Sequence, residues 1–329
     1  MIITRTPLRI SIGGGGTDLP SYYRDHGGFV ISAAINKYVY ISVNRHFFPG
    51  YLLKYSETEH ADSIESIKHR LIREALTTFP PDRPLEIVSV ADVPAGTGLG
   101  SSGTFLVGLI HALAAHEHRI ADAEMLARSA VEIEMVRLNE PVGKQDQYIA
   151  AYGGLLCQEY NQDESVKVYP LKLSENSLHE LRDSLMLFFV GTTRSASSIL
   201  QDQKKKSEQG DSSMIESLHL TRQLGREIQT VLESGDIPRF GELMHEHWLR
   251  KRQRSAGMSN NRIDELYELA RTAGGAIGGK LVGAGGSGFL LFQTHDRSRL
   301  RKVMKNAGLS EMDFSFDFEG SAVMLRNQG

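Results

Sequence analysis

The segment Val90-ADVPAGTGLGSSG-Thr104 joins a stretch that predicts a β-strand to a stretch that predicts an α-helix. Within it, the eight residues from Gly96 to Gly103 contain four glycines and two serines. Glycine allows the backbone to turn sharply and to bring its N–H groups close to a ligand. The first turn of a helix adds unpaired N–H donors and the positive end of the helix dipole. The segment therefore predicts a phosphate-binding loop, in which Ser101 and Ser102 cap the helix or reach a phosphate or Mg²⁺; a tight turn with a serine cap is the structural alternative.

Context rejects three other interpretations of the glycine-rich segments. Gly98–Gly103 (GLGSSG) matches the dinucleotide-binding fingerprint, but Val93–Thr97 intervenes after the predicted strand, whereas that fingerprint closes a tight strand-to-helix turn. Gly283–Gly288 (GAGGSG) matches as well, yet it leads into a predicted strand. Gly274–Lys280 (GGAIGGK) resembles a P-loop, but Leu281 replaces the required Ser or Thr. A dinucleotide-dependent oxidoreductase, which would bind NAD(H), is therefore the least favoured alternative.

Length, composition and charge define the class of protein. The chain has 329 residues, of which 40% are hydrophobic and 23% are charged, so two globular domains are expected. The net charge of −3 gives no support for a nucleic-acid or anionic-membrane partner. The single cysteine, Cys157, excludes an intrachain disulfide and is typical of a reducing compartment. The densest apolar run, Phe105–Ala115, is too short to span a bilayer, and the N-terminus lacks a signal-peptide pattern, so a cytoplasmic protein is expected.

Local patterns predict the helices and strands. β-branched and aromatic residues favour strands, and runs of good helix formers favour helices. The predicted strands are Ile31–Val43, Leu85–Val90, Leu185–Val190, Phe289–Gln293 and Ala322–Leu325, and the predicted helices are Ser101–His116, Asp122–Leu138, Ser212–Glu233, Arg239–Arg252, Arg262–Ala273 and Arg297–Asn306. A polar stretch at Tyr160–Ser184 separates two halves, so the predicted domains are 1–170 and 171–329. The segment QDQKKKSEQGD at 201–211 is expected to be a mobile surface loop.

Three ordered motifs carry a resemblance to a known family. Thr6-PLRISIGGGGTDLP-Ser21, Pro94-AGTGLGSS-Gly103 and Lys280-LVGAGGSGF-Leu290 resemble the motifs of the GHMP kinases, which phosphorylate galactose, homoserine, mevalonate and phosphomevalonate. The resemblance covers nearly the whole chain. It is closest to bacterial D-glycero-D-manno-heptose 7-phosphate kinases and their sugar-kinase relatives, through GGGGTDLP, Gly143-KQDQYIAAYGG-Leu155, and His247-WLRK followed by SNNRID.

The resemblance implies a two-domain α+β fold. Its N-terminal domain is similar to the second domain of ribosomal protein S5, and its C-terminal domain is ferredoxin-like. MgATP is expected at the middle motif and the sugar between the domains. Two positions depart from the family pattern: Ser287 stands where Gly is usual, and Gly103 stands where Ala or Ser is usual. Neither change removes a charged group.

The resemblance also assigns catalytic and ATP-binding residues. Asp146, in the G-x-x-D-Q element that begins at Gly143, is expected to deprotonate or orient the sugar hydroxyl. Arg9 is expected to act electrostatically near the transferred phosphate, since arginine stays protonated and cannot serve as a base. The expected ATP-binding residues are Pro94, Gly96, Gly98, Leu99, Gly100, Ser101, Ser102 and Gly103. Without the resemblance, Asp146 would be read as a surface carboxylate in a loop and Arg9 as a solvated strand residue.

Mg²⁺ is the expected cofactor, because it accompanies ATP and prefers oxygen ligands. Ser102 and Glu134 match the metal site of the family. Helical periodicity leaves Glu132 and Glu134 equivalent, because the predicted helix is apolar over much of its circumference. Only the match to the family, with Glu134 twelve positions before Asp146, selects Glu134.

The expected substrate-binding residues, again from the resemblance, are Thr17, Asp18, Gly285 and Gly286. For the first two, a turn capped by the aspartate is the structural alternative. A sugar that already carries a phosphate also needs basic donors, for which Arg194 and Lys251 are the candidates; basic side chains at such positions are otherwise solvated. His245 and His247 project about 200° apart on a helix, so a shared metal ion is not expected.

These observations predict an ATP-dependent sugar kinase. The leading hypothesis, from the resemblance, is transfer of the γ-phosphoryl group to the anomeric hydroxyl of D-glycero-D-manno-heptose 7-phosphate, giving the 1,7-bisphosphate for nucleotide-sugar synthesis. One alternative is an unphosphorylated sugar such as galactose, fucose or an N-acetylhexosamine. Another is a sugar or ATP sensor without turnover, against which the retention of Arg9, Ser102, Glu134 and Asp146 argues. The expected partners are ATP and a sugar or sugar phosphate, with no nucleic acid and no membrane; a homodimer is compatible with the sequence.

Overall fold

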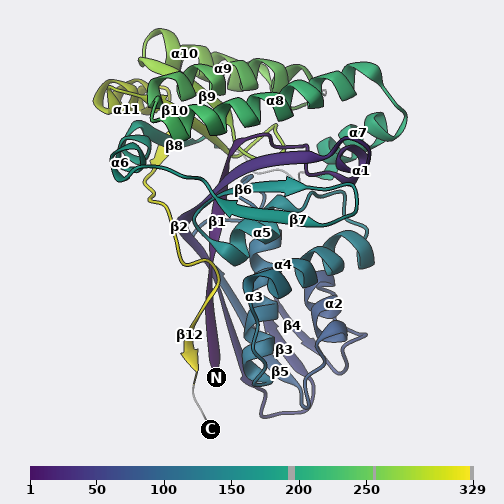
Figure 1. Cartoon of the computed structure of the whole chain (residues 1–329). Coiled ribbons are helices and arrows are strands. Elements are labelled where there is room, and N and C mark those ends of the chain that lie inside the picture. The colour runs from purple at the N-terminus through teal and green to yellow at the C-terminus, as the bar shows by residue number, and fades with distance from the viewer. Residues whose placement is uncertain (192–196, 255–256, 327–329) are drawn as a thin grey trace.

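A computed structural model describes residues 1–191, 197–254 and 257–326, which are organised around two β-sheets (Figure 1). The larger sheet consists of β1 (Ile2–Gly13), β2 (Gly28–Arg45), β3 (Tyr51–Lys54), β4 (Thr58–Ala61), β5 (Leu85–Ala91), β6 (Leu155–Tyr160), β7 (Val166–Pro170) and β12 (Ala322–Arg326). The smaller sheet consists of β8 (Leu185–Phe189), β9 (Ala276–Leu281), β10 (Phe289–Thr294) and β11 (Ser310–Met312). The helices are α1 (Pro20–His26), α2 (Arg70–Thr78), α3 (Ser101–His116), α4 (Ala123–Val131), α5 (Gln145–Tyr152), α6 (Glu175–Ser184), α7 (Ser197–Glu208), α8 (Ser212–Ser234), α9 (Ile237–Arg254), α10 (Asn261–Thr272) and α11 (Arg297–Asn306), with a π-helix, η1 (Glu132–Arg137), after α4.

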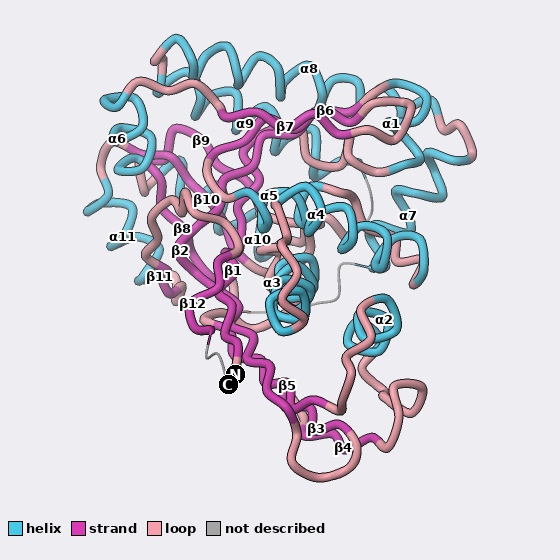
Figure 2. Tube along the Cα trace, turned by 60° about the horizontal axis from the view of Figure 1, so that its bottom comes forward, coloured by secondary structure: helices cyan, strands magenta, loops and turns pink. Residues whose placement is uncertain are grey.

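Strands β1 and β2 form the centre of the larger sheet. They pair antiparallel, and β2 is long enough to pair with β6 near its start and with β5 near its end. Strand β12 pairs with the other side of β1, so the two ends of the described chain lie side by side (Figure 1 and Figure 2). The predicted division into 1–170 and 171–329 stays a prediction, but sheet membership departs from it in one place, because β12 returns to the larger sheet.

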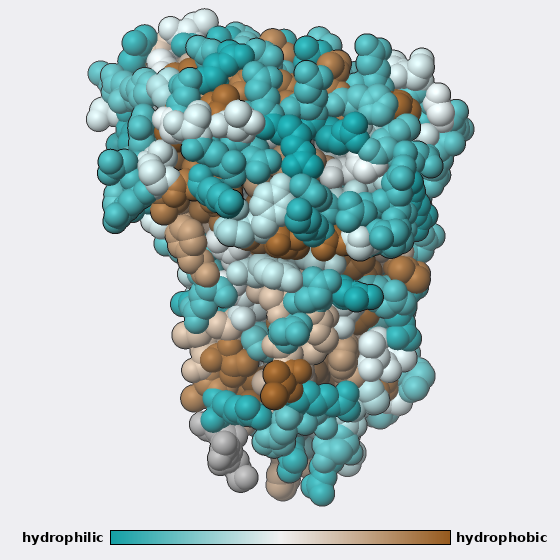
Figure 3. Space-filling view, in the orientation of Figure 1, coloured by the Kyte–Doolittle hydropathy of each residue, from teal (hydrophilic) through white to brown (hydrophobic). Residues whose placement is uncertain are grey.

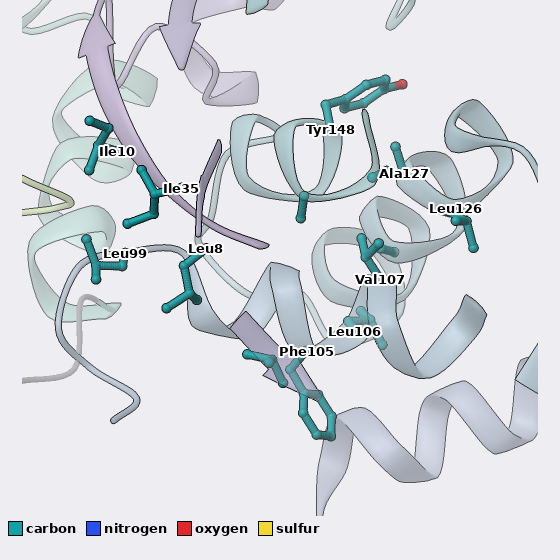
Figure 4. Close-up of a cluster of buried hydrophobic side chains, with 14 of the residues drawn as sticks. Leu8, Ile10, Ile35, Leu99, Phe105, Leu106, Val107, Leu126, Ala127 and Tyr148 are labelled. Atoms are coloured by element: carbon teal, nitrogen blue, oxygen red, sulfur yellow. The ribbon is translucent and has the colours of Figure 1, made fainter. Parts of the chain in front are cut away.

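Helix α3 is buried because it is apolar around its whole circumference. It packs against β1 and β2 and also against α4 and α5. Figure 4 shows Phe105 and Val107 of this helix in a hydrophobic cluster with Leu8 of β1, Leu126 of α4 and Tyr148 of α5. A helix that is apolar all round must be covered on all sides. Its first turn, and the glycine loop before it, are therefore held in a defined position.

The smaller sheet has the strand order β11-β8-β10-β9, in which the fourth strand along the chain lies beside the first, and the third beside the second. Helices α7 to α10 connect β8 to β9, and α11 connects β10 to β11. This is the βαββαβ arrangement of a ferredoxin-like domain, as predicted. Aromatic side chains from the strands (Phe188, Phe292) and from α9 and α10 (Trp248, Tyr267) fill its core.

Two predicted elements differ from the structure. Residues 201–208 belong to helix α7, so the prediction of a mobile loop at 201–211 is wrong. Gln, Lys and Glu are good helix formers, and Ile199, Gln203 and Ser207, spaced four residues apart, are buried. The predicted helix Asp122–Leu138 is instead α4, capped by Asp122, followed by the π-helix η1. Such π-turns occur frequently at functional sites.

The surface is ordinary for a globular chain. Figure 3 shows hydrophilic residues over most of one face, with hydrophobic residues gathered in small groups. Among the described residues, no helix combines the length and apolar character that a membrane span requires.

Candidate active site

The glycine loop between β5 and α3 has a backbone shape that depends on its glycines. Gly96, Gly98 and Gly100 have φ angles of 77°, 80° and 81°, in the left-handed region that other residues avoid. Gly100 directly precedes α3. The loop therefore winds around the N-terminus of a buried helix, where free N–H groups and the positive end of the dipole favour an anion.

The third motif packs against this loop, backbone against backbone. A Cβ atom added to Gly283 would lie 2.6 Å from Cα of Gly98, and one added to Gly288 would overlap the carbonyl group of Thr97. Only glycine allows so close an approach. The contact brings the turn between β9 and β10 of the smaller sheet against the loop that leads out of the larger sheet.

Arg9 of β1 and Asp146 in the first turn of α5 form a bidentate ion pair. Arg9 Nε donates to Asp146 Oδ1 at 2.7 Å, and Nη2 donates to Oδ2 at 2.8 Å. The remaining nitrogen, Nη1, donates to the carbonyl oxygen of Gly98. Helix α5 approaches α3 closely, because a Cβ atom at Gly103 would lie only 3.0 Å from Asp146 Cβ. Arg9 thus ties the carboxylate of α5 to the glycine loop.

Glu134 is a buried carboxylate on the π-helix. Gln147 Nε2 donates to Glu134 Oε2 at 2.6 Å, and Ser102 also hydrogen-bonds to this carboxylate. Burial raises the pKa of Glu134 to about 7, because these two neutral partners offset only part of the desolvation. Glu132 is exposed, so the tertiary structure separates two glutamates that periodicity leaves equivalent. A carboxylate and a hydroxyl beside one cavity suit a hard cation such as Mg²⁺.

Asp18 is a second buried carboxylate, only 1% exposed. It accepts hydrogen bonds from the backbone N–H groups of Gly16 at 3.0 Å and Gln145 at 3.3 Å, and from the Gln145 side chain. Burial raises the pKa of Asp18, and the neighbouring charge of Asp146 raises it further. Gly143 makes room for it, since a Cβ atom there would overlap the carboxylate.

A cavity of about 660 Å³ collects residues from all three motifs. The predicted site residues that line it are Arg9, Asp18, Gly96, Gly98, Gly100, Ser101, Ser102, Glu134, Asp146, Lys251 and Gly285. β1, the glycine loop and α5 line one part of it, and α9 and the third motif line another. Its volume lies within the usual range for small-molecule sites, about 300–1,000 Å³.

Other predicted residues do not line this cavity. They are Pro94, Leu99, Gly103, Thr17 and Gly286. The Thr17 hydroxyl hydrogen-bonds to the carbonyl oxygens of Gly14 and Phe29 at 2.9 Å, and the Gly286 N–H donates to the Met258 carbonyl oxygen at 3.0 Å. Backbone groups thus occupy these polar atoms of Thr17 and Gly286, and their roles in substrate binding stay predictions. Arg194 lies outside the described residues.

One side of the cavity, which we call the basic wall, carries buried basic groups. It consists of His247, Lys251 and Arg254 of α9 and Lys280 of β9, each at most 7% exposed. Lys251 Nζ donates to the carbonyl oxygens of Leu281, at 3.1 Å, and Gly283. Burial, with added repulsion from Arg254 and Arg9, lowers the pKa of Lys251 to about 7. The sequence pointed only to Lys251; the i, i+4, i+7 spacing of the three α9 residues is the signal that identifies one helix face.

His245 and His247 lie in different environments, as predicted. His245 Nδ1 hydrogen-bonds with the Tyr267 hydroxyl at 2.7 Å, and Arg271 donates to His245 Nε2 at 2.9 Å. His247 lines the cavity instead. The two rings therefore do not form a common metal site.

Two families match parts of the chain. The GHMP kinases N terminal domain matches residues 64–154, and the GHMP kinases C terminal family matches residues 228–308. The D-glycero-alpha-D-manno-heptose 7-phosphate kinase of Campylobacter jejuni is 32% identical, over 97% of this chain and 97% of that protein. The bifunctional fucokinase/GDP-fucose pyrophosphorylase of Arabidopsis thaliana is 25% identical, over 90% of this chain and 30% of that protein.

Solved structures share the architecture. A D-glycero-D-manno-heptose 1-phosphate kinase from Bacteroides thetaiotaomicron superposes with a TM-score of 0.81 at 25% identity, covering 100% of both chains. Lactococcus lactis galactokinase, solved with galactose, has a TM-score of 0.76 at 15% identity, covering 98% of this chain and 94% of that one. At the latter identity the likeness concerns the fold alone. The predicted two-domain α+β fold is confirmed.

Proposed function

The chain belongs to the GHMP kinases and is a phosphotransferase that acts on a sugar hydroxyl, and we propose that its acceptor is a phosphorylated heptose. In this proposal, the γ-phosphoryl group of ATP passes to the anomeric hydroxyl of D-glycero-D-manno-heptose 7-phosphate and gives the 1,7-bisphosphate. The relative that is 32% identical over 97% of the chain is named for a kinase of this sugar phosphate, which supports the proposal.

The observation that carries the proposal is the Arg9–Asp146 pair beside the glycine loop. Phosphoryl transfer needs a positioned nucleophile and positive charge near the transferred group, with little covalent chemistry from the protein. Asp146 orients the acceptor hydroxyl by accepting a hydrogen bond from it. Arg9 holds both oxygens of this carboxylate and also bonds the Gly98 carbonyl oxygen. This one side chain therefore sets the position of the acceptor hydroxyl relative to the loop that binds the ATP phosphates.

The N–H groups of the glycine loop and of the first turn of α3 bind the phosphates of ATP in this proposal. Ser102 and Glu134 fit Mg²⁺, because both offer oxygen ligands and the hydrogen bonds to the buried Glu134 carboxylate come from neutral groups in the described chain. Bound Mg²⁺ supplies neutralisation of the charge on the phosphate oxygens. Gln147 orients the Glu134 carboxylate, since its amide donates to Oε2.

The test is ADP release with MgATP against a panel of acceptors. The panel contains heptose 7-phosphate, heptose 1-phosphate, free heptose, fucose and galactose, and ³¹P NMR of the product locates the new phosphate. We expect rapid turnover of heptose 7-phosphate, with the new phosphate on the anomeric oxygen. Turnover of heptose 1-phosphate alone would mean that the acceptor is a hydroxyl other than the anomeric one. Preferred turnover of fucose or galactose would contradict a phosphorylated acceptor. ATP binding without any turnover would favour a sensor.

A further inference from the structure

The basic wall carries positive charge that the surrounding protein does not balance. Within the described part of the chain, Lys251, Arg254 and Lys280 form no ion pair with a carboxylate. Their hydrogen-bond acceptors are all neutral: carbonyl oxygens of Leu281 and Gly283 for Lys251, of Ile12 for Lys280 and of Gly15 for Arg254, and the hydroxyls of Ser217 and Thr221 for Arg254. Three buried cationic side chains therefore face one cavity without an anionic partner.

Such an arrangement is costly in the free protein. A buried charge without a counter-ion costs several kcal/mol. Burial and the neighbouring cations accordingly lower the pKa of Lys251 to about 7 and that of Lys280 well below its usual value. An anion in the cavity would supply the missing counter-charge and stabilise the charged form of both lysines.

His247 provides an independent observation. It is 1% exposed and lines the cavity, and neither ring nitrogen has a hydrogen-bond partner among the described residues. Burial, reinforced by Lys280 and Lys251, lowers its pKa well below the usual value, so the ring is neutral and offers one N–H donor. An unpartnered buried polar group is destabilising. A ligand oxygen that accepts a hydrogen bond from the His247 N–H would remove this destabilisation.

The basic wall contacts the first motif at two points. Arg254 reaches the carbonyl oxygen of Gly15 in the first motif, where Asp18 also lies, and Lys280 reaches that of Ile12. The first motif supplies Arg9 as well, which binds the catalytic carboxylate Asp146. The wall therefore borders the part of the cavity where the acceptor must present its hydroxyl.

We propose that His247, Lys251, Arg254 and Lys280 form a subsite for a phosphate group already carried by the acceptor. This subsite, and not the Arg9–Asp146 pair, selects phosphorylated over unphosphorylated sugars. Three cationic groups and one neutral N–H donor from two elements match the several oxygens of a phosphate dianion. The proposal rests on the proposed function and deepens it, since it adds His247, Arg254 and Lys280 to Lys251, which the sequence analysis named as a candidate donor to a sugar phosphate.

The experiment compares the wild type with Lys251→Met and His247→Leu, and uses Arg250→Met as the matched control, because Arg250 lies exposed on the same helix. Inorganic phosphate binding is measured by calorimetry with saturating MgADP, which occupies the glycine loop. Turnover is measured with heptose 7-phosphate and with free heptose. We expect both variants to weaken phosphate binding about 10–100-fold and to lower kcat/KM for the phosphorylated sugar by a similar factor. The kcat/KM for free heptose should change by no more than about threefold in both variants, and Arg250→Met should resemble the wild type in every measurement.

Thermal unfolding and MgADP affinity show whether each variant is folded, and His247→Leu keeps the test available if Lys251→Met is not. Equal losses for phosphorylated and free heptose would assign the wall to packing and overturn the proposal. Phosphate binding that survives in both folded variants would also overturn it. If the wild type turns over neither heptose, yet binds phosphate that the variants do not, the proposed function fails and the subsite stands.

Discussion

The charged side chains at the two ends of the cavity differ in whether the protein itself supplies a counter-charge. At the glycine-loop end, Arg9 and Asp146 neutralise each other through two hydrogen bonds before any ligand arrives. At the α9 end, Lys251 and Lys280 bond only to carbonyl oxygens within the described chain. The first end is therefore organised for chemistry by the protein itself, which is how a site avoids reorganisation during the reaction. The second end is completed only by a ligand, as expected of a site that selects its substrate by charge.

The largest expected effect comes from removing the Arg9–Asp146 ion pair at the glycine-loop end of the cavity. Asp146→Asn keeps the size of the side chain but loses the charge that Arg9 binds, so the acceptor hydroxyl is no longer held and cannot give up its proton to this group. We expect kcat to fall about 10²–10⁴-fold, with the Kd of MgATP within about threefold of the wild type. ADP release and calorimetry measure the two quantities. Asp163→Asn, at an exposed loop position, is the control; an unchanged kcat in Asp146→Asn would remove this residue from the mechanism.

A smaller effect at the same end concerns the metal. Glu134→Gln replaces a charged ligand oxygen with a neutral one, so the Mg²⁺ concentration for half-maximal rate should rise about tenfold or more. Glu132→Gln changes an exposed carboxylate on the same π-helix and should leave the Mg²⁺ dependence unchanged. The measurement is the initial rate as a function of free Mg²⁺ at saturating ATP. Equal shifts in both variants would show that the buried position of Glu134 carries no metal-specific role.

Substrate binding at the basic wall should depend on pH. Burial, Arg254 and Arg9 lower the pKa of Lys251 to about 7, so this side chain is charged below that pH and neutral above it. Burial and repulsion from Lys251 also lower the pKa values of Lys280 and His247. The KM for heptose 7-phosphate should therefore rise between pH 7 and 9, by at most about tenfold per pH unit for each proton lost.

The control for this pH effect is free heptose, whose KM should stay flat over the same range because it carries no anion. Parallel KM profiles for the two sugars would mean that the charge of Lys251 does not contribute to selection. In Lys251→Met the rise in KM for the phosphorylated sugar should be reduced, since one of the titrating groups is absent.

The smallest effect lies at the edge of the cavity, where α7 supports the first motif. Gln203 Nε2 donates to the carbonyl oxygen of Gly16 at 3.0 Å, and Gln203 is 1% exposed. Loss of one such hydrogen bond costs about 1 kcal/mol, so Gln203→Ala should raise the KM for the acceptor about fivefold with little change in kcat. Lys205→Ala, exposed on the same helix, is the control. A change in kcat without a change in KM would contradict a purely supporting role.

The parts of this protein that the sequence predicted are those governed by local backbone chemistry. The glycine loop is one example. Three of its glycines adopt positive φ angles, which few other residues tolerate, so the positions of the glycines predict the backbone conformation of the loop. Helix α3 is another, because a continuous apolar stretch with good helix formers has few alternatives. Asp122, the first residue of the predicted helix Asp122–Leu138, caps α4 by accepting a hydrogen bond from the Met125 N–H at 2.7 Å.

Other features depend on contacts that no local pattern contains. Helix α7 has a polar sequence, and the buried positions of Gln203 and Ser207 follow from its tertiary packing. Glu134 is buried and Glu132 is exposed, although both lie on the π-helix η1. Thr17 matched a substrate-binding position, yet its hydroxyl is used by the backbone of its own motif and of β2.

The sequence by itself determined the geometry of the glycine loop, because glycine spacing acts over a few residues, and the resemblance of its ordered motifs to the GHMP kinases implied the two-domain fold. Only the tertiary structure decided which charges meet. Arg9 and Asp146 are 137 positions apart and form an ion pair, whereas Lys251 and Lys280 come from different elements and share a cavity without a carboxylate partner in the described chain. Electrostatic pairing depends on the distance between the charges in space and on the exclusion of water. Neither can be inferred from a local sequence pattern.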